Sequence, residues 1–468
     1  MTQKEMQSIM EIGTAISSEK DYNRLLEMIL NRIMELTHAD AGTLYLADGD
    51  LLRFKIMCNN TMHTCEGGDG KEPNLPPVRM SRENVCAMCY LENRAVCIEN
   101  VRTSTEYDFS GPVRYDAMTG YHTQSMLVVP MHNRQGERLG VIQLINAMDA
   151  AGNICAFPAD IIPAVESVAS QAAITIQNVL YIENIKELFE SFVRVMSSAV
   201  DERTPYNASH TRHMVEYGRH FIDYLNETAK AEGREPWFDA EHRHELLMSV
   251  WLHDIGKLVI PLEVMNKEAR LLPEQKSEIL HRFEKMRLLA QIACLKGAIS
   301  GETLEKRLEE LKQAGDTILR ANTAGFCPDD LREEICRIRE KTYTEEDGSE
   351  KPWLEEEEFQ MLMIRKGTLS EKERAVMESH VVITDKLLSE IRFSKELSHV
   401  REWAASHHEL LNGSGYPEHL MAEQIPMEVR IITILDIFDA LVADDRPYKP
   451  GMPVEKALGI LDIMADKE

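Results

Sequence analysis

The sequence lacks any apolar run long enough to cross a bilayer, and its first residues are polar and helix-patterned, unlike a signal peptide. Positive charge is also scarce, because 52 Lys and Arg stand against 78 Asp and Glu and leave a net charge of -26. Phosphate backbones and anionic lipids are bound by clustered cations, which such a surface does not offer. We therefore expect a cytoplasmic protein whose partners include neither a nucleic-acid polymer nor a membrane.

Proline and cysteine are few as well. The 18 prolines and 44% hydrophobic residues are typical of globular domains, and 468 residues predict two or three of them. Nine cysteines form an odd number without an export signal, so we expect reduced thiols and no disulfide framework. Four of them lie close together, at Cys58, Cys65, Cys86 and Cys89. A metal or redox site is the less favoured interpretation, since one CxxC lacks a matching pair, and small core residues explain them better.

Residues 1–160 alternate helical and strand patterns. A helical stretch at 21–40 precedes a strand, turn and strand at 41–57, and a hairpin follows at 125–147. This order predicts an antiparallel sheet flanked by helices, an α+β domain. Together with LVVPM and GVIQLINA, it resembles a GAF domain, a fold that senses small molecules. The resemblance implies a pocket lined by residues 108–127 but does not identify the ligand.

Residues 162–200 have the pattern of one long helix. Apolar residues recur at alternating spacings of three and four, broken by Thr175 and Lys186. The pattern favours a parallel coiled coil and a homodimer through 162–200, ahead of a helix packed on its own domain. The predicted seam contains Val165, Val168, Ala172, Val179, Ile182, Phe189, Val193, Met196 and Val200.

Histidine and aspartate gather in residues 201–468, whose pattern is almost entirely helical. His253 and Asp254 end an apolar helix, and such a pair can serve two metals if the carboxylate bridges them. Alone, the pair is equally well explained as a helix cap. Further candidates near patterned helices are His210, His380, His407, His408 and Asp436. Together these residues are hard to explain as a solvated surface, so we predict a buried polynuclear metal site.

Three motifs in this region resemble the HD superfamily of metal-dependent phosphohydrolases and, within it, the HD-GYP cyclic di-GMP phosphodiesterases. They are HDIGK at 253–257, HHELLNGSGYP at 407–417 and DIFDALVADDRPYK at 436–449. The resemblance implies an all-α domain with His210, His253, Asp254, His380, His407, His408 and Asp436 as metal ligands. It places Lys257 against the scissile phosphate, as a catalytic residue with Asp254. It also implies that the nucleotide is bound by Gly415, Tyr416, Asp439, Arg446 and Lys449.

The implied chemistry is hydrolysis of cyclic di-GMP to pGpG, with further cleavage to GMP left open. Two divalent ions lower the pKa of a shared water and stabilise the attacking and leaving oxygens. Iron or manganese is expected ahead of zinc, from the preference of that family and the His and carboxylate ligands. Two other functions stay open: a receptor that binds a dinucleotide or a partner without turnover, and a phosphohydrolase of another cyclic dinucleotide.

The sequence departs from the HD-GYP pattern in several places. Tyr206 stands where some members have a glutamate for a third metal, so we expect two ions. Asn412 stands where the family commonly has an aspartate. VVIT follows His380 where the family usually has a Pro and a Gly. We expect these changes to affect the shape of the substrate pocket more than the binding of metal. The charged, helix-patterned residues 267–366 form an insertion that could act as a lid or a regulatory contact. Whether the chain is truncated after 468 is left open.

The expected organisation is therefore a GAF sensor domain at 1–160, a signalling and dimerisation helix at 161–200, and an HD-GYP domain at 201–468 that contains the insertion. The ligand of the sensor domain and the direction of regulation are not predicted.

Overall fold

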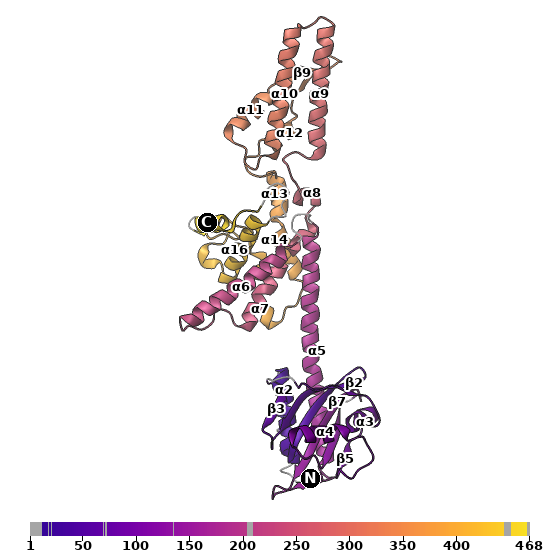
Figure 1. Ribbon diagram of the computed structural model, residues 1–468. Coiled ribbons are helices and arrows are strands. Elements are labelled where there is room, and N and C mark those ends of the chain that lie inside the picture. The colour runs from indigo at the N-terminus through magenta and orange to yellow at the C-terminus, as the bar shows by residue number, and fades with distance from the viewer. Residues whose placement is uncertain are drawn as a thin grey trace. The chain divides into compact units, whose positions relative to one another are not determined.

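The computed structural model describes residues 12–16, 18–19, 21–68, 70, 73–133, 135–203, 209–443 and 451–465. The chain divides into two compact units, Met1–Phe189 and Glu190–Glu468, each with its own hydrophobic core. Helix α5 (Ile162–Asp201) contributes to both units and is one uninterrupted helix in Figure 1. Within the described residues, no helix is both long and apolar enough to cross a membrane.

The first unit is an antiparallel sheet with the strand order β3-β2-β1-β7-β6-β5. Its strands are β1 (Ala39–Asp48), β2 (Leu51–Asn59), β3 (Thr64–Gly67), β4 (Val78–Arg79), β5 (Val96–Ile98), β6 (Met126–His132), β7 (Arg138–Met148) and β8 (Ile154–Cys155). Its helices, besides the start of α5, are α2 (Tyr22–Thr37), α3 (Val85–Glu92) and α4 (Ser110–Thr119). The predicted strand–turn–strand at 41–57 and the hairpin at 125–147 are confirmed as β1–β2 and β6–β7.

Side chains alternate between the two faces of this sheet along each strand, and each face is covered by its own hydrophobic cluster. Leu44 of β1 packs with α2 and the first half of α5. Its neighbour Tyr45 points to the other face, into a second cluster with α3. In the segment 108–127, expected to line a pocket, the buried Tyr121 hydroxyl donates to Asp40 over 2.7 Å.

The first half of α5 is part of this core and not a free surface. Val165, Val168 and Ala172 are fully buried against the sheet and α2. In the second unit, Val193 and Val200 are buried as well. These five residues of the predicted coiled-coil seam are therefore buried within the chain, three on the first half of α5 and two on its second half.

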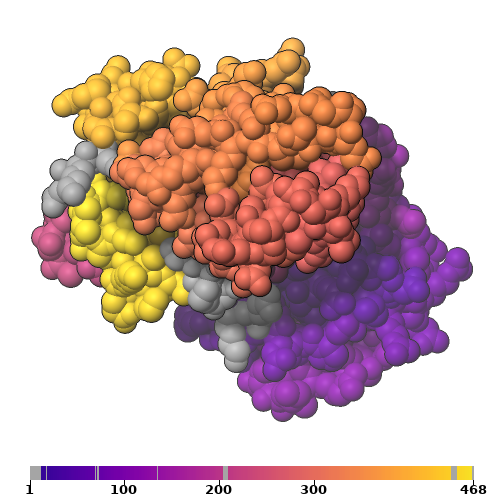
Figure 2. All heavy atoms as spheres, turned by 90° about the horizontal axis from the view of Figure 1, so that it is seen from above, coloured from indigo at the N-terminus to yellow at the C-terminus, as the bar shows by residue number. Residues whose placement is uncertain are grey.

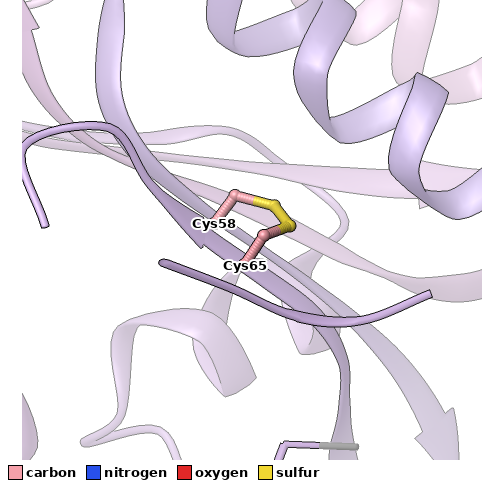
Figure 3. Close-up of a disulfide and its surroundings, with 2 residues drawn as sticks. All are labelled: Cys58 and Cys65. Carbon is pink, nitrogen blue, oxygen red and sulfur yellow. A yellow bond between two sulfur atoms is a disulfide. The ribbon is translucent and has the colours of Figure 1, made fainter. Parts of the chain in front are cut away.

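One disulfide corrects the expectation that all cysteines are reduced. Cys58 of β2 and Cys65 of β3 are bonded, as Figure 3 shows, with their Cα atoms 4.1 Å apart. The two residues are direct partners in the antiparallel register, which brings them together across a short turn. Cys86 and Cys89 are free and buried on α3, where Cys89 Sγ donates to the Val128 carbonyl. The four cysteines thus do not form one site.

The second unit is helical outside the insertion. Its elements, in chain order, are α6 (His210–Ala231), α7 (Ala240–Leu252), η1 (Ile255–Val259), α8 (Leu262–Met265), α13 (Glu371–Glu378), α14 (His380–Leu388), η2 (Lys395–Leu397), α15 (Val400–Ala405), η3 (Ala422–Gln424), α16 (Met427–Val442) and α17 (Val454–Ala465). Helices α6, α7, α15 and α16 pack around one core that includes Met214, Val250, Trp403 and Ile432. Every predicted histidine ligand lies on or next to one of these helices or α14.

The insertion has a core of its own. It contains α9 (Pro273–Leu295), α10 (Gly301–Thr323), α11 (Asp329–Arg339), β9 (Thr342–Thr344), β10 (Glu350–Pro352) and α12 (Glu356–Leu362). Helices α9 and α10 run alongside each other in Figure 1, and the atoms of the insertion, red to orange in Figure 2, form one continuous mass. It is helical as expected, apart from the β9–β10 hairpin.

Two contacts close the base of the insertion. The fully buried Arg270 donates from Nε to the Ile364 carbonyl over 2.9 Å, and from Nη1 to the carbonyls of Ala321 and Ala324. Lys267 forms an ion pair with Glu373 over 2.7 Å. The chain therefore enters and leaves the insertion at one closed point.

The state of the cysteines can be tested by alkylation of the unreduced protein followed by peptide mapping. Cys58 should be recovered linked to Cys65. Exposed Cys97 should be labelled much faster than Cys86, because burial raises the pKa of Cys86 to about 12 and leaves almost no thiolate at neutral pH. Labelling of Cys58 and Cys65 at the rate of Cys97, without any reductant, would contradict the pairing.

Candidate metal centre

Three of the predicted histidine ligands are held in the same way. His253, His380 and His407 are almost completely buried, and the Nδ1 of each lies 2.7 Å from the carbonyl oxygen three residues earlier. A carbonyl can only accept, so Nδ1 carries the proton in all three rings. The Nε2 lone pair is then free to face the centre, which is the form of histidine that binds metals.

The candidate ligands form two groups. His380, His407 and His408 make one, and His210, His253 and Asp254 make the other. Within each group the ligand atoms lie within 4.8 Å of one another. Two separate clusters of this size are what a pair of ions requires, since each ion needs several ligands at short range.

Asp254 belongs to the second group and also faces the first. Its Oδ1 is 3.5 Å from His380 Nε2 and 3.9 Å from His407 Nε2, while its Oδ2 is 3.3 Å from His253 Nε2. Asp436 spans the groups in a similar way, with Oδ1 3.4 Å from His210 Nε2 and Oδ2 3.8 Å from His408 Nδ1. Each carboxylate therefore presents one oxygen to each group.

Several buried polar atoms of this centre have no hydrogen-bond partner among the described residues. They are the Nε2 atoms of His253, His380 and His407 and the Oδ1 atom of Asp254. Unsatisfied polar atoms in a protein interior are costly and therefore rare. All four point to the same small region, where divalent cations would satisfy them together, so the residues present fit a metal pair.

The charge states agree with this role. Burial lowers the pKa of His380 to about 4 and holds that of His407 well below its usual value, so both are neutral ligands at neutral pH. Burial opposes ionisation of Asp254, but Lys257 and the neighbouring histidines outweigh it and hold the pKa of Asp254 well below its usual value. Burial likewise disfavours a charged His210, yet its carboxylate partners raise the pKa of His210 to about 10. The carboxylates thus create a position that favours positive charge.

Lys257 lies at the edge of the centre. Its Nζ is 2.6 Å from Asp254 Oδ2, and its side chain is 20% exposed. Burial alone would lower its pKa, but the charges of Asp254 and Asp436 raise it, so Lys257 is a cation. Its side chain is thus mostly buried but still partly accessible to solvent.

The HDIGK turn is packed directly on the helix of His380. A Cβ atom at Gly256 would lie 1.9 Å from the His380 carbonyl oxygen, so only glycine fits there. The Thr384 hydroxyl accepts from the Gly256 amide over 3.0 Å and donates to the His253 carbonyl over 3.1 Å. One sequence signal could have indicated Thr384, its position one helical turn after His380 in VVIT.

Glu409 holds the loop that follows the two adjacent histidines. It is almost fully buried, and its two oxygens accept from the amides of Glu418 and Leu420 over 2.7 and 2.9 Å. A Cβ atom at Gly415 would lie 2.2 Å from the Leu410 nitrogen, so the loop folds tightly back on itself. Gly415 is therefore needed for the close packing of this loop, and its contact with a nucleotide stays a prediction.

The other expected nucleotide-binding residues lie in different surroundings. The Tyr416 ring is 4.8 Å from the His408 ring, between centroids. Asp439 is buried and accepts from His210 Nδ1 over 2.6 Å, so in this structure its carboxylate contacts a candidate metal ligand. Arg446 and Lys449, as well as Tyr206 on which the expectation of two ions rested, lie outside the described residues.

Comparison with known proteins finds one family match in each unit. Residues 21–176 match the family model of the GAF domain, and residues 357–468 match that of the HD domain. The 3'3'-cGAMP-specific phosphodiesterase 3 of Vibrio cholerae is 39% identical over 101 residues, which cover 22% of this chain and 21% of that protein. The cyclic di-GMP phosphodiesterase response regulator RpfG of Xanthomonas campestris is 40% identical over 102 residues, 21% of this chain and 26% of that protein.

A cyclic di-GMP phosphodiesterase of Thermotoga maritima is 35% identical over 106 residues, 23% of this chain and 28% of that protein. The chain therefore matches less than a third of the length of each of these three relatives.

Asp439→Asn tests whether Asp439 orients His210. Removing the charge should lower the affinity for Mn(II) by about tenfold or more, as loss of a carboxylate behind a metal-bound histidine does. Titration calorimetry measures it, with Glu428→Gln as the control, since Glu428 binds His242 and none of the candidate ligands. Unchanged Mn(II) affinity with a raised KM for the dinucleotide would instead support the nucleotide contact.

Proposed function

Since residues 21–176 form a GAF domain and residues 357–468 belong to an HD domain, we propose that the protein is a sensor-regulated, metal-dependent phosphodiesterase. Its proposed reaction is hydrolysis of cyclic di-GMP to pGpG. One observation carries this proposal: residues far apart in the sequence bring two groups of ligands together around Asp254, with four buried ligand atoms left unpartnered among the described residues.

The proposed ligands are the seven residues that the family resemblance implies, His210, His253, Asp254, His380, His407, His408 and Asp436. When bound, a metal pair would supply an activated water and stabilise charge on the phosphoryl oxygens. Imidazole and carboxylate ligands together suit iron or manganese, which are the ions we propose.

The chain supplies the positioning for this reaction. Asp254 and Asp436 set the spacing of the two groups, and the carbonyls behind the histidines keep each Nε2 directed inward. Lys257 places a cation at the open edge, where it would offset the negative charge that develops on the phosphate. The half-buried Tyr416 ring, next to His408, is placed to stack on a base.

A second substrate has specific support. Relatives of similar identity are named as phosphodiesterases of cyclic di-GMP and of 3'3'-cGAMP. Both substrates share the phosphodiester linkage that the proposed centre would hydrolyse. They differ in a base, so the contacts of Tyr416 and the loop around it would decide between them.

We also propose a homodimer, through a different face of α5 from the one expected. Apolar side chains at 181, 185, 188, 192 and 195 are more than half exposed, with Leu188 at 70%. Their spacing alternates between four and three, which is the seam of a two-stranded coiled coil. Charged residues of this stretch, Glu183, Lys186, Glu187, Glu190 and Arg194, all lie off that seam.

The reaction is tested by anaerobic turnover of cyclic di-GMP by the full chain loaded with Fe(II) or Mn(II), followed by chromatography. We expect pGpG, and we expect Asp254→Ala to abolish it because both groups lose the carboxylate they share. Asp223→Ala is the matched control, since Asp223 pairs with Arg243 on the surface. Bound metal without turnover of cyclic di-GMP or 3'3'-cGAMP would favour a receptor, and faster turnover of 3'3'-cGAMP would change the substrate.

The dimer is tested with Leu188→Glu, which would place two like charges against each other across the seam. Light scattering after size-exclusion chromatography should show a dimer for the unmodified chain and a monomer for the variant. Leu295→Glu is the matched control, because Leu295 is 88% exposed at the end of α9, a helix that contributes no residue to the seam. An unmodified chain that is monomeric at micromolar concentration would refute the seam.

A further inference from the structure

Helix α5 ends next to the start of the helix that carries His210. Its last residue, Asp201, is buried, and its Oδ1 accepts from the Thr211 hydroxyl over 3.0 Å. Asp201 Oδ2 also accepts from the Thr211 amide over 3.3 Å. Thr211 directly follows His210 at the beginning of α6. One carboxylate therefore ties the end of α5 to the backbone beside a proposed metal ligand.

Two residues further on, Arg203 binds the turn that carries Lys257. Its Nη1 donates to the carbonyl of Lys257 over 2.7 Å and also to that of Leu258. Its Nη2 donates to the carbonyl of Ile260 over 3.0 Å. A guanidinium is rigid and planar, so three acceptors in one turn fix that turn far more closely than a single hydrogen bond does.

The opposite side of the same turn is fixed on α14. Gly256 is in contact with the His380 carbonyl, and Thr384 binds the backbone on both sides of the turn. The turn is thus held between the end of α5 and the helix of His380. The end of α5 therefore contacts the backbone at Lys257 through Arg203 and the backbone beside His210 through Asp201.

We propose that Asp201 and Arg203 are positioning residues that couple helix α5 to the metal centre. Neither side chain belongs to the proposed ligand set. Asp201 acts through the backbone at His210, and Arg203 acts through the backbone at Lys257. A role of these two residues in regulating turnover rests on the proposed function. Their effect on the geometry of the metal centre does not.

Arg203→Ala in the full chain is the first test. The rate constant kcat for cyclic di-GMP should fall by about tenfold or more, because small displacements of a catalytic group are costly, while KM stays nearly constant. Hydrogen exchange should rise in peptides covering 253–260 and stay unchanged in α16. Added guanidinium ion should restore part of kcat, and an equal concentration of KCl should not. A purely structural role would predict neither the selective loss of kcat nor this rescue.

Arg194→Ala is the matched control, since Arg194 lies on helix α5 and contacts Glu190 and Ser191 of the same helix near its surface. If Arg203→Ala does not fold, Arg203→Lys keeps the charge without the planar fork and should have an intermediate kcat. Asp201→Ala should weaken Mn(II) binding, measured by calorimetry, because the backbone at His210 loses its anchor.

The proposal is overturned if Arg203→Ala and Asp201→Ala match Arg194→Ala in Mn(II) affinity and in exchange of 253–260. If the unmodified chain binds Mn(II) but does not turn over cyclic di-GMP, the proposed function fails. The coupling is then decided by the exchange and the Mn(II) affinity alone, so the two failures are distinguishable.

Discussion

The Asp254 carboxylate, buried between two groups of imidazoles, is the constraint on which the second unit depends. A buried charge is tolerated only with partners that compensate it. Here Lys257 supplies one positive charge, and the surrounding histidines direct unprotonated Nε2 atoms toward the same region. The helices α6, α7, α14 and α16 and the loop after α15 all converge there. The helices of this unit therefore converge on a buried carboxylate and on histidine nitrogens that have no partner among the described residues.

Much of the fold and of the centre could be predicted from the sequence, because the relevant signals are local. Alternating strands, one long helix and short histidine motifs are each legible in a few consecutive residues. The roles of Thr384 and Glu409 are not predictable from the sequence. Each side chain binds backbone atoms of a segment distant in sequence or across a loop, and a sequence does not show where carbonyls and amides point. The sequence predicts Asp439 as a nucleotide contact, which stays a prediction. It does not predict the contact with His210, because Asp436 and Asp439 lie one turn apart on α16 and only the fold decides which of them meets His210 Nδ1.

The predicted helix at 162–200 is present as α5, but five of the residues predicted for its dimer seam are buried within the chain. Its apolar residues serve the core of the first unit, the core of the second, and an exposed stripe between 181 and 195. In the sequence these three sets of apolar residues follow the same helical spacing, so they cannot be told apart and look like a single seam. Similarly, nothing local predicts that Cys58 pairs with Cys65, because the register of β2 and β3 decides which residues are opposite.

The closed base of the insertion has a consequence for chain entropy. The segment between Lys257 and His380 is long in sequence, yet the Arg270 contacts and the Lys267–Glu373 ion pair join its two ends. Joining distant ends costs entropy that grows only slowly with loop length, and a folded insert offsets that cost with its own core. The insertion therefore connects the HDIGK turn to the helix of His380 as a short linker would, because its two ends are held together. Its length and surface can change through evolution while the distance between the HDIGK turn and His380 stays the same.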